Sequence, residues 1–359
     1  MTRQNGTKPK PVLVTAVFSV VWAIWLRVCP VKLGNMRRLF FAGVILALAL
    51  TATGCTRESP PIPGVSPAAV RVASLKGPTT MGLVQLMDKS AKGASIQPYT
   101  FTMAGTPDAI SGPLVAGQLD IALIPVNLAA VLYAKTNGGV KLAAVNTLGV
   151  LYIVTGDPSV NSLADLTGKT VLNSGQGTTP QFVLDKVLAS QNITGVNADY
   201  RGQPTEEASI LAATPNTIAV LPEPYVTIAM AANSNVHIVA DLNRGWQQAT
   251  GSPLVTGCVA VRTAFADINA SAVTIFMREY AASVSFVNNS PTDAAPLIVA
   301  QGLAPDTATA EQAIPRTHIV DITGADAKSA VTAYLNVLYA ADPASVGGAI
   351  PDDQFYYNA

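Results

Sequence analysis

The chain has 359 residues, with 22 Lys and Arg against 22 Asp and Glu, and only 12% of its residues are charged. A chain this poor in charge lacks the basic surface that nucleic-acid binding requires, so nucleic-acid partners are excluded. Its length is sufficient for two lobes of roughly 100–150 residues each, together with a leader.

A leader is predicted at residues 36–54. Met36-Arg37-Arg38 is a basic start, residues 39–50 are apolar but too few to span a bilayer, and a small-residue cleavage site follows. The predicted mature chain, residues 55–359, keeps 15 basic and 22 acidic residues. We interpret residues 1–35 as an upstream extension added by a misassigned start, or alternatively as a further membrane segment.

The cleavage site Ala52-Thr53-Gly54-Cys55 resembles the lipobox of bacterial lipoproteins, although Ala52 stands where Leu is usual. The resemblance implies that Cys55 carries lipid and becomes the new N-terminus. An uncleaved anchor is the alternative, and in either case the rest of the chain is expected outside the cytoplasm. Residues 55–67 are rich in proline and are predicted to form a semi-rigid tether.

Strand-like and helical patterns alternate from residue 70 to residue 147. The patterns predict strands at 70–75, 97–103, 119–124 and 140–147, with helices at 79–90, 107–116 and 126–134. Strands that alternate with helices of this length indicate βαβ units and a parallel sheet. This part is assigned to the first of two lobes, which takes residues 68–152 together with 258–359.

A second lobe is predicted over residues 153–257, because the same alternation starts again there. Its expected strands lie near 198–201, 217–221 and 236–240, and its helices at 178–190, 205–213 and 224–232. Residues 148–155 and 253–262 are predicted to cross between the lobes and to serve as a hinge. Four further helices, at 269–288, 291–301, 306–313 and 325–340, are expected to cover the first lobe.

The two lobes repeat one motif. Gly77-Pro78-Thr79-Thr80 opens a helix after one strand and Gly177-Thr178-Thr179 opens a helix after another; the strands Ile121–Pro125 and Ile218–Pro222 follow at matching separations. Ligands of open α/β sheets bind beyond the carboxyl ends of the strands, where helices begin. The repeat therefore predicts a ligand cleft between two facing lobes.

Ten residues near these strand ends are candidates for ligand contact. The threonine pairs could present free N–H groups and hydroxyls or simply cap their helices. Asn127 and Glu223 could read a ligand edge or act as caps, while the aromatic candidates could stack on a ligand or pack within a lobe. The candidates are Thr79, Thr80, Met81, Asn127, Tyr152, Thr178, Thr179, Glu223, Tyr225 and Trp246.

No catalytic or metal-binding pattern is present in the sequence. His237 and His318 have no metal-ligand spacing, Cys258 is expected to be a buried small hydrophobe, and Gly175-Gln176-Gly177 lacks the Lys of a P-loop. We therefore predict a protein that is not an enzyme and that holds no metal or cofactor. The cleft motifs also contain no Arg, which favours a neutral or amine-bearing heterocycle over a sulfonate or nitrate.

Several short sequence motifs together resemble those of a known family. These are Lys76–Gly82, Gly117–Ala122, Leu163–Thr170, Glu223-Pro224-Tyr225 and Ile350–Tyr357. In this order they are similar to extracytoplasmic substrate-binding proteins of ABC importers, of the nitrate, sulfonate and thiamine-precursor branch. The resemblance implies a periplasmic-binding-protein type II-like α/β fold with two βα lobes.

The resemblance further implies a monomer, held at the membrane by lipid on Cys55, that delivers a small-molecule ligand to an ABC permease and its ATPase. Two alternatives are open. Enzymes of pyrimidine and menaquinone biosynthesis are similar to this fold, and an extracytoplasmic ligand sensor could use the same lobes.

Overall fold

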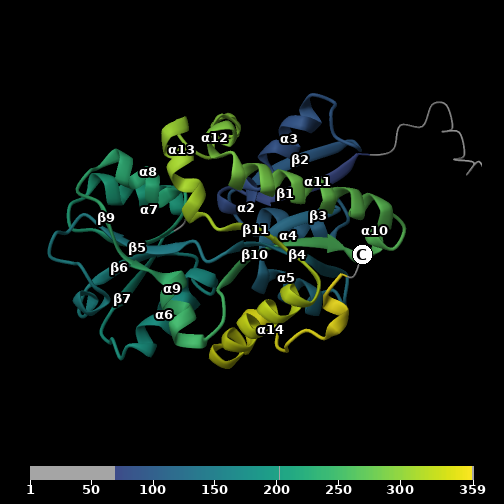
Figure 1. Ribbon diagram of the computed structural model, residues 1–359. Helices are drawn as coiled ribbons and strands as arrows, with labels where there is room; N and C mark the ends of the chain where they lie inside the picture. The colour runs from purple at the N-terminus through teal and green to yellow at the C-terminus, as the bar shows by residue number, and fades with distance from the viewer. Residues whose placement is uncertain (1–68, 202, 358–359) are drawn as a thin grey trace, which may run out of the picture. The chain divides into compact units, whose positions relative to one another are not determined.

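Two mixed β-sheets flanked by helices organise the chain (Figure 1). The computed structural model describes residues 69–201 and 203–357. The predicted extension, the signal peptide, Cys55 and the tether up to residue 67 therefore lie outside the described residues. Among the helices within the described ranges, none combines the length and the apolar character needed to cross a membrane.

The first lobe is built on a six-stranded sheet with the strand order β11-β4-β10-β3-β1-β2. β1, β2 and β3 are parallel, as predicted, whereas β10 is antiparallel to both β3 and β4. β10 enters from the second lobe, so it runs against its neighbours and the sheet is mixed. The strands are β1 (Val70–Leu75), β2 (Tyr99–Ala104), β3 (Ile121–Pro125), β4 (Val140–Leu148), β10 (Val255–Arg262) and β11 (Ile319–Ile322).

The second lobe contains a five-stranded sheet with the order β7-β6-β8-β5-β9. β5 crosses over from the first lobe and is antiparallel to β8 and β9, which mirrors the place of β10 in the other sheet. Both crossing strands thus lie inside a sheet. The strands are β5 (Leu151–Thr155), β6 (Thr170–Ser174), β7 (Asn197–Arg201), β8 (Ile218–Pro222) and β9 (His237–Asp241).

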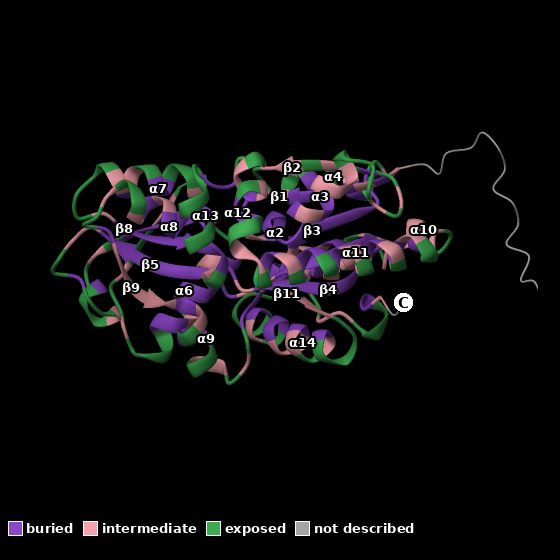
Figure 2. Cartoon of the chain, turned by 45° about the horizontal axis from the view of Figure 1, so that its top comes forward, coloured by how far each residue is buried: buried purple, intermediate pink, exposed green. Residues whose placement is uncertain are grey.

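The central strands are buried on both faces, and this explains their continuous apolar sequences (Figure 2). All five residues of β5 are buried, and β3 and β8 each bury four consecutive residues. Cys258 of β10 is a buried free cysteine, as expected, and burial raises the pKa of its thiol. The outer faces of the helices carry the exposed residues (Figure 2).

Helices flank both sheets, and each lobe has its own set. The first lobe has α2 (Pro78–Met81), α3 (Val84–Ala91), α4 (Asp108–Val115), α5 (Val126–Lys135), α10 (Thr263–Ala266), α11 (Ala270–Asn289), α12 (Pro291–Ala300) and α14 (Gly324–Ala341). The second lobe has α6 (Thr179–Ser190), α7 (Pro204–Ala213), α8 (Tyr225–Ala232) and α9 (Leu242–Thr250).

Three details differ from the sequence-based expectation. The helix predicted at 79–90 is divided into α2 and α3. β11 was not predicted, because four residues that include Asp321 carry little strand signal. α13 (Thr307–Ala313) contacts α8 of the second lobe as well as α12, so the C-terminal helices do not cover the first lobe alone.

Candidate ligand-binding site

A cavity of about 690 Å³ lies where the carboxyl ends of the two sheets face each other. This volume is in the range of small-molecule sites. Its walls come from the segments that follow β1, β2 and β3 in the first lobe and β6, β7 and β8 in the second. The repeat in the sequence therefore corresponds to two matching walls of one cavity.

The two walls approach each other closely around the cavity. A Cβ atom placed on Gly77 would lie 3.7 Å from Cε2 of Tyr225, and one placed on Gly105 would lie 3.7 Å from Oε1 of Gln203, both ordinary van der Waals distances. Gly77 has a φ of +128°, a backbone conformation that L side chains rarely adopt, so the backbone rather than the space favours glycine there. A molecule inside this cavity would therefore touch both lobes.

Five of the ten predicted residues line the cavity: Thr79, Asn127, Thr178, Thr179 and Tyr225. The hydroxyl of Thr179 lies 3.0 Å from the hydroxyl of Tyr334 on α14 and 3.4 Å from Oδ1 of Asn127. These hydrogen bonds join the first turn of α6 directly to the opposite lobe. Thr179 therefore belongs to the cavity wall and also to the contact between the lobes.

The cavity threonines do not act as simple helix caps. Thr178 occupies the N-cap position of α6, but its hydroxyl donates to the carbonyl of Gly175 at 2.5 Å instead of accepting from an N–H group. Thr79 similarly donates to the carbonyl of Leu75 at 2.8 Å. Because both hydroxyl hydrogens are used, these oxygens can serve a ligand only as acceptors.

The other five predicted residues lie outside the cavity. Thr80 is fully buried, with its hydroxyl bonded to Ser74 and the carbonyl of Leu75, and Met81 is part of the hydrophobic core. Successive residues of a helix point about 100° apart, so only Thr79 of this run lines the cavity. Tyr152 is buried, and its hydroxyl donates to the carbonyl of Arg316.

Trp246 and Glu223 are buried by long-range contacts. α9 extends from Leu242 to Thr250 and places Trp246 in the core against Tyr334, with ring centroids 5.5 Å apart. Glu223 is fully buried and forms an ion pair with Arg316. Neither side chain lines the cavity, and both contact other protein groups instead.

Several cavity residues were not predicted. Most of them lie at the end of β2, β6 or β7 or just after it, and the others come from distant segments. They include Thr106, Asp108, Ser174, Gln203, Thr205, Thr256 and Ser345. The strand-end rule would have found those after β2, β6 and β7 if it had been applied to every parallel strand. Ser345 comes from the 3₁₀ helix Pro343–Val346, and no local signal connects it to the site.

Most of the groups that line the cavity are neutral polar or apolar. Among the described lining residues there is no Arg, His, Cys or Glu, and Lys76 and Asp108 are both exposed. Burial raises the pKa of Tyr225 to about 12, so its hydroxyl stays protonated at neutral pH. The arrangement can recognise a ligand by hydrogen bonds and apolar contact.

The two histidines lie outside the cavity and contact backbone oxygens. Nε2 of His237 is 2.9 Å from the carbonyl of Val160, and Nδ1 of His318 is 2.5 Å from that of Gly149. Within the described residues, no group of three His, Cys, Asp or Glu side chains is placed to hold a metal ion.

Several solved structures share this architecture. A protein described as an ABC transporter from Parabacteroides distasonis is 24% identical, with a TM-score of 0.70 over 81% of this chain and 99% of that one. The aliphatic sulphonate-binding protein of Escherichia coli is 14% identical, with a TM-score of 0.63 over 82% and 93%. The zinc-bound component of an ABC-type import system from Staphylococcus aureus is 13% identical, with a TM-score of 0.63 over 80% and 97%.

These likenesses confirm the periplasmic-binding-protein fold that the resemblance implied. None of the curated proteins matches the sequence. One family model, described as menaquinone biosynthesis, matches residues 79–338, which include every strand of the two sheets except β1 and most of the cavity wall. The chain therefore belongs to the menaquinone biosynthesis family.

Proposed function

We propose that this chain is the solute-binding component of an ABC importer, which captures a small organic molecule between its lobes and delivers it to a membrane permease. The observation that carries the proposal is the cavity, which both lobes line with hydroxyl and amide groups. The import components among the solved structures support this reading. The basic, apolar and small-residue pattern of residues 36–55 supports a lipid-anchored, extracytoplasmic protein.

The proposed ligand is neutral or carries an amine. An anion enclosed among these lining residues would lose its hydration without meeting a buried cationic side chain, and such a loss is costly. The carbonyl of Asn127 and the hydroxyls of Thr79 and Thr178 can accept hydrogen bonds from ligand N–H groups. Binding would shift the population of the protein toward the closed arrangement, because only that arrangement lets one molecule contact both walls.

A thermal-shift screen of metabolites against the full chain tests this function. A ligand present at 100 times its Kd should stabilise the protein by about 2.7 kcal/mol. Tyr225→Phe removes one neutral hydrogen-bonding group from the cavity and should weaken binding by roughly three- to tenfold. The matched control is Tyr339→Phe on α14, which removes an exposed hydroxyl outside the cavity and should leave the affinity unchanged.

The screen can also contradict the proposal. A well-folded sample that shows no shift across a broad panel, and that carries no small molecule detectable by mass spectrometry after purification, would count against a solute receptor. Equal loss of affinity in both tyrosine variants would show that the ligand binds elsewhere.

An enzyme of menaquinone biosynthesis is the second candidate, and the family match favours it. The two functions differ in one measurable way, since a receptor releases its ligand unchanged. Incubation of the purified chain with each ligand found in the screen, followed by mass spectrometry of the mixture, should return the ligand intact. Accumulation of a product with multiple turnovers would reverse the ranking.

A further inference from the structure

The first turn of α8 carries Tyr225, a residue of the cavity wall. The side chain of Glu223, just before this helix, forms hydrogen bonds with the same turn. The Glu223 carboxylate accepts hydrogen bonds from the backbone N–H of Thr227 at 3.1 Å and from its hydroxyl at 2.9 Å. The side chain of Glu223 is fully buried. A buried carboxylate needs a charged partner as well as hydrogen bonds, so the source of that partner matters.

The partner is Arg316, 93 residues further along the chain. Its Nε lies 2.5 Å from Oε1 of Glu223, and its Nη2 donates to the hydroxyl of Thr227 at 2.5 Å. The carbonyl of Arg316 accepts a hydrogen bond from the hydroxyl of Tyr152 on β5 at 3.3 Å. Arg316 thus contacts β5, the end of β8 and the first turns of α8, all within the second lobe.

The segment that carries Arg316 is tied to the first lobe on its other side. Arg316 ends the 3₁₀ helix Ile314–Arg316, and β11 begins three residues later in the six-stranded sheet. Between them, the hydroxyl of Thr317 lies 3.9 Å from the sulfur of Met81 in the core of the first lobe. α13, just before Arg316, contacts both α12 and α8 (Figure 1). The residues 307–318 therefore connect the lobes in addition to the two crossing strands.

We propose that Arg316 is a positioning residue of the cavity. Through Glu223 it fixes the first turn of α8, holds Tyr225 opposite Gly77, and links the second lobe to the C-terminal strand of the first. Its role as a site residue rests on the proposed ligand-binding function, but its effect on the lobes can be measured without a ligand. Losing the ion pair should release the α8 wall and populate a more open arrangement.

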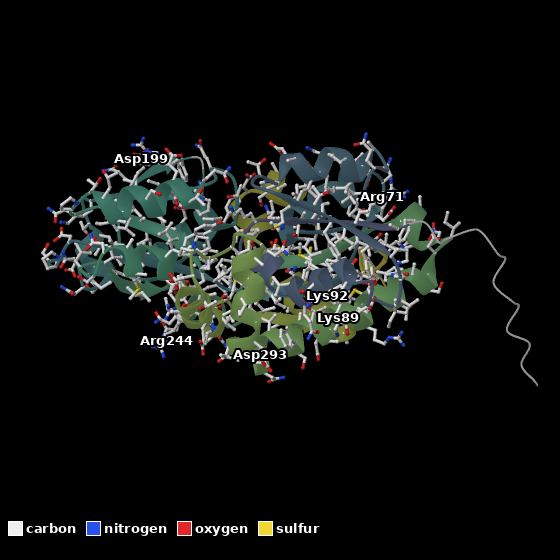
Figure 3. All side chains as sticks on the ribbon, turned by 90° about the horizontal axis from the view of Figure 1, so that it is seen from above. Arg71, Lys89, Lys92, Asp199, Arg244 and Asp293 are labelled. Carbon is white, nitrogen blue, oxygen red and sulfur yellow. The ribbon has the colours of Figure 1, made fainter. Side chains whose placement is uncertain are left out.

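Pulsed electron paramagnetic resonance between two spin labels tests the inference. The labels replace Lys92 at the end of α3 and Arg244 on α9, two exposed residues of different lobes that are labelled in Figure 3. The full chain also carries Cys29→Ser and Cys55→Ser, while the buried Cys258 remains unlabelled. The protein with Arg316 should give mainly the short distance with a minor population of longer ones, and Arg316→Gln should raise that minor population about tenfold.

Three further variants keep the test decisive if Arg316→Gln folds poorly. Arg316→Lys retains the charge and should restore most of the short distance. The double variant Glu223→Gln/Arg316→Gln has no unpaired buried charge, so it should fold, and it should still open. The control Arg201→Gln breaks the ion pair with Asp199 inside the second lobe and should leave the distance unchanged.

An unchanged distance in the folded double variant would overturn the inference, as would equal opening in the Arg201→Gln control. These measurements use no ligand. A failed metabolite screen would therefore count against the proposed function and leave the role of Arg316 in holding the lobes to be decided by the distances alone.

Discussion

Replacing Trp246 with alanine should lower the free energy of unfolding by about 3–5 kcal/mol. The indole is fully buried on α9, and its ring lies 5.5 Å from that of Tyr334 on α14 of the other lobe. Its removal would leave a large cavity at the contact between the lobes, in a core that cannot collapse without moving one of them. Urea denaturation followed by circular dichroism measures the loss.

Trp246→Phe is the matched control for this prediction. It keeps an aromatic ring against Tyr334 and removes the indole N–H, which has no hydrogen-bond partner in the structure. We expect it to cost clearly less than the alanine variant, because part of the packing is retained and an unpaired polar group is lost. Equal destabilisation by both variants would show that ring packing between the lobes is not the source of the effect.

The stability of the protein should fall as the pH rises from about 4.5 to about 8, because of Glu207. Both carboxylate oxygens of this fully buried residue lack hydrogen-bond partners, and burial, reinforced by the charges of Glu206 and Asp199, raises its pKa to about 8. The folded chain then binds a proton that the unfolded chain, with its ordinary pKa, has already released. The protonated Glu207 therefore stabilises the folded state fully below about pH 4.5, and this stabilisation is lost as the pH rises to about 8.

Glu207→Gln should remove this dependence and make the protein more stable than wild type at pH 9, by roughly 2–4 kcal/mol. At pH 5 both proteins carry a neutral side chain, so their stabilities should be similar. The control is Glu206→Gln on the same helical turn, whose exposed side chain should change the slope only slightly. A wild-type stability that is flat between pH 5 and pH 9 would contradict the raised pKa of Glu207.

The repeated strand-end motif was predictable because its signal is local. The strand Ile121–Pro125 and the strand Ile218–Pro222 are continuous apolar runs, and each is followed directly by a helix. Such patterns locate the carboxyl ends of both parallel strands without any long-range information. The cavity lies at those ends, as the sequence predicted.

The residues that contact the predicted site residues could not be predicted from local sequence patterns. Glu223 lies at a strand end, as the repeat indicates, yet its carboxylate forms an ion pair with Arg316, 93 positions away. Ser345 reaches the cavity, and Tyr334 bonds to Thr179, from C-terminal segments that carry no motif. These contacts exist only because the C-terminal chain folds back on both lobes.

The sequence alone determined the two βα halves and the edge of each sheet at which a ligand would bind, because strand and helix patterns are set by neighbouring residues. Only the tertiary structure decided which side chains line the cavity at those edges. Thr79 and Thr80 are adjacent, yet one lines the cavity and the other bonds within the core. A rotation of about 100° per helical residue separates them, and the packing of each helix on its sheet sets that rotation.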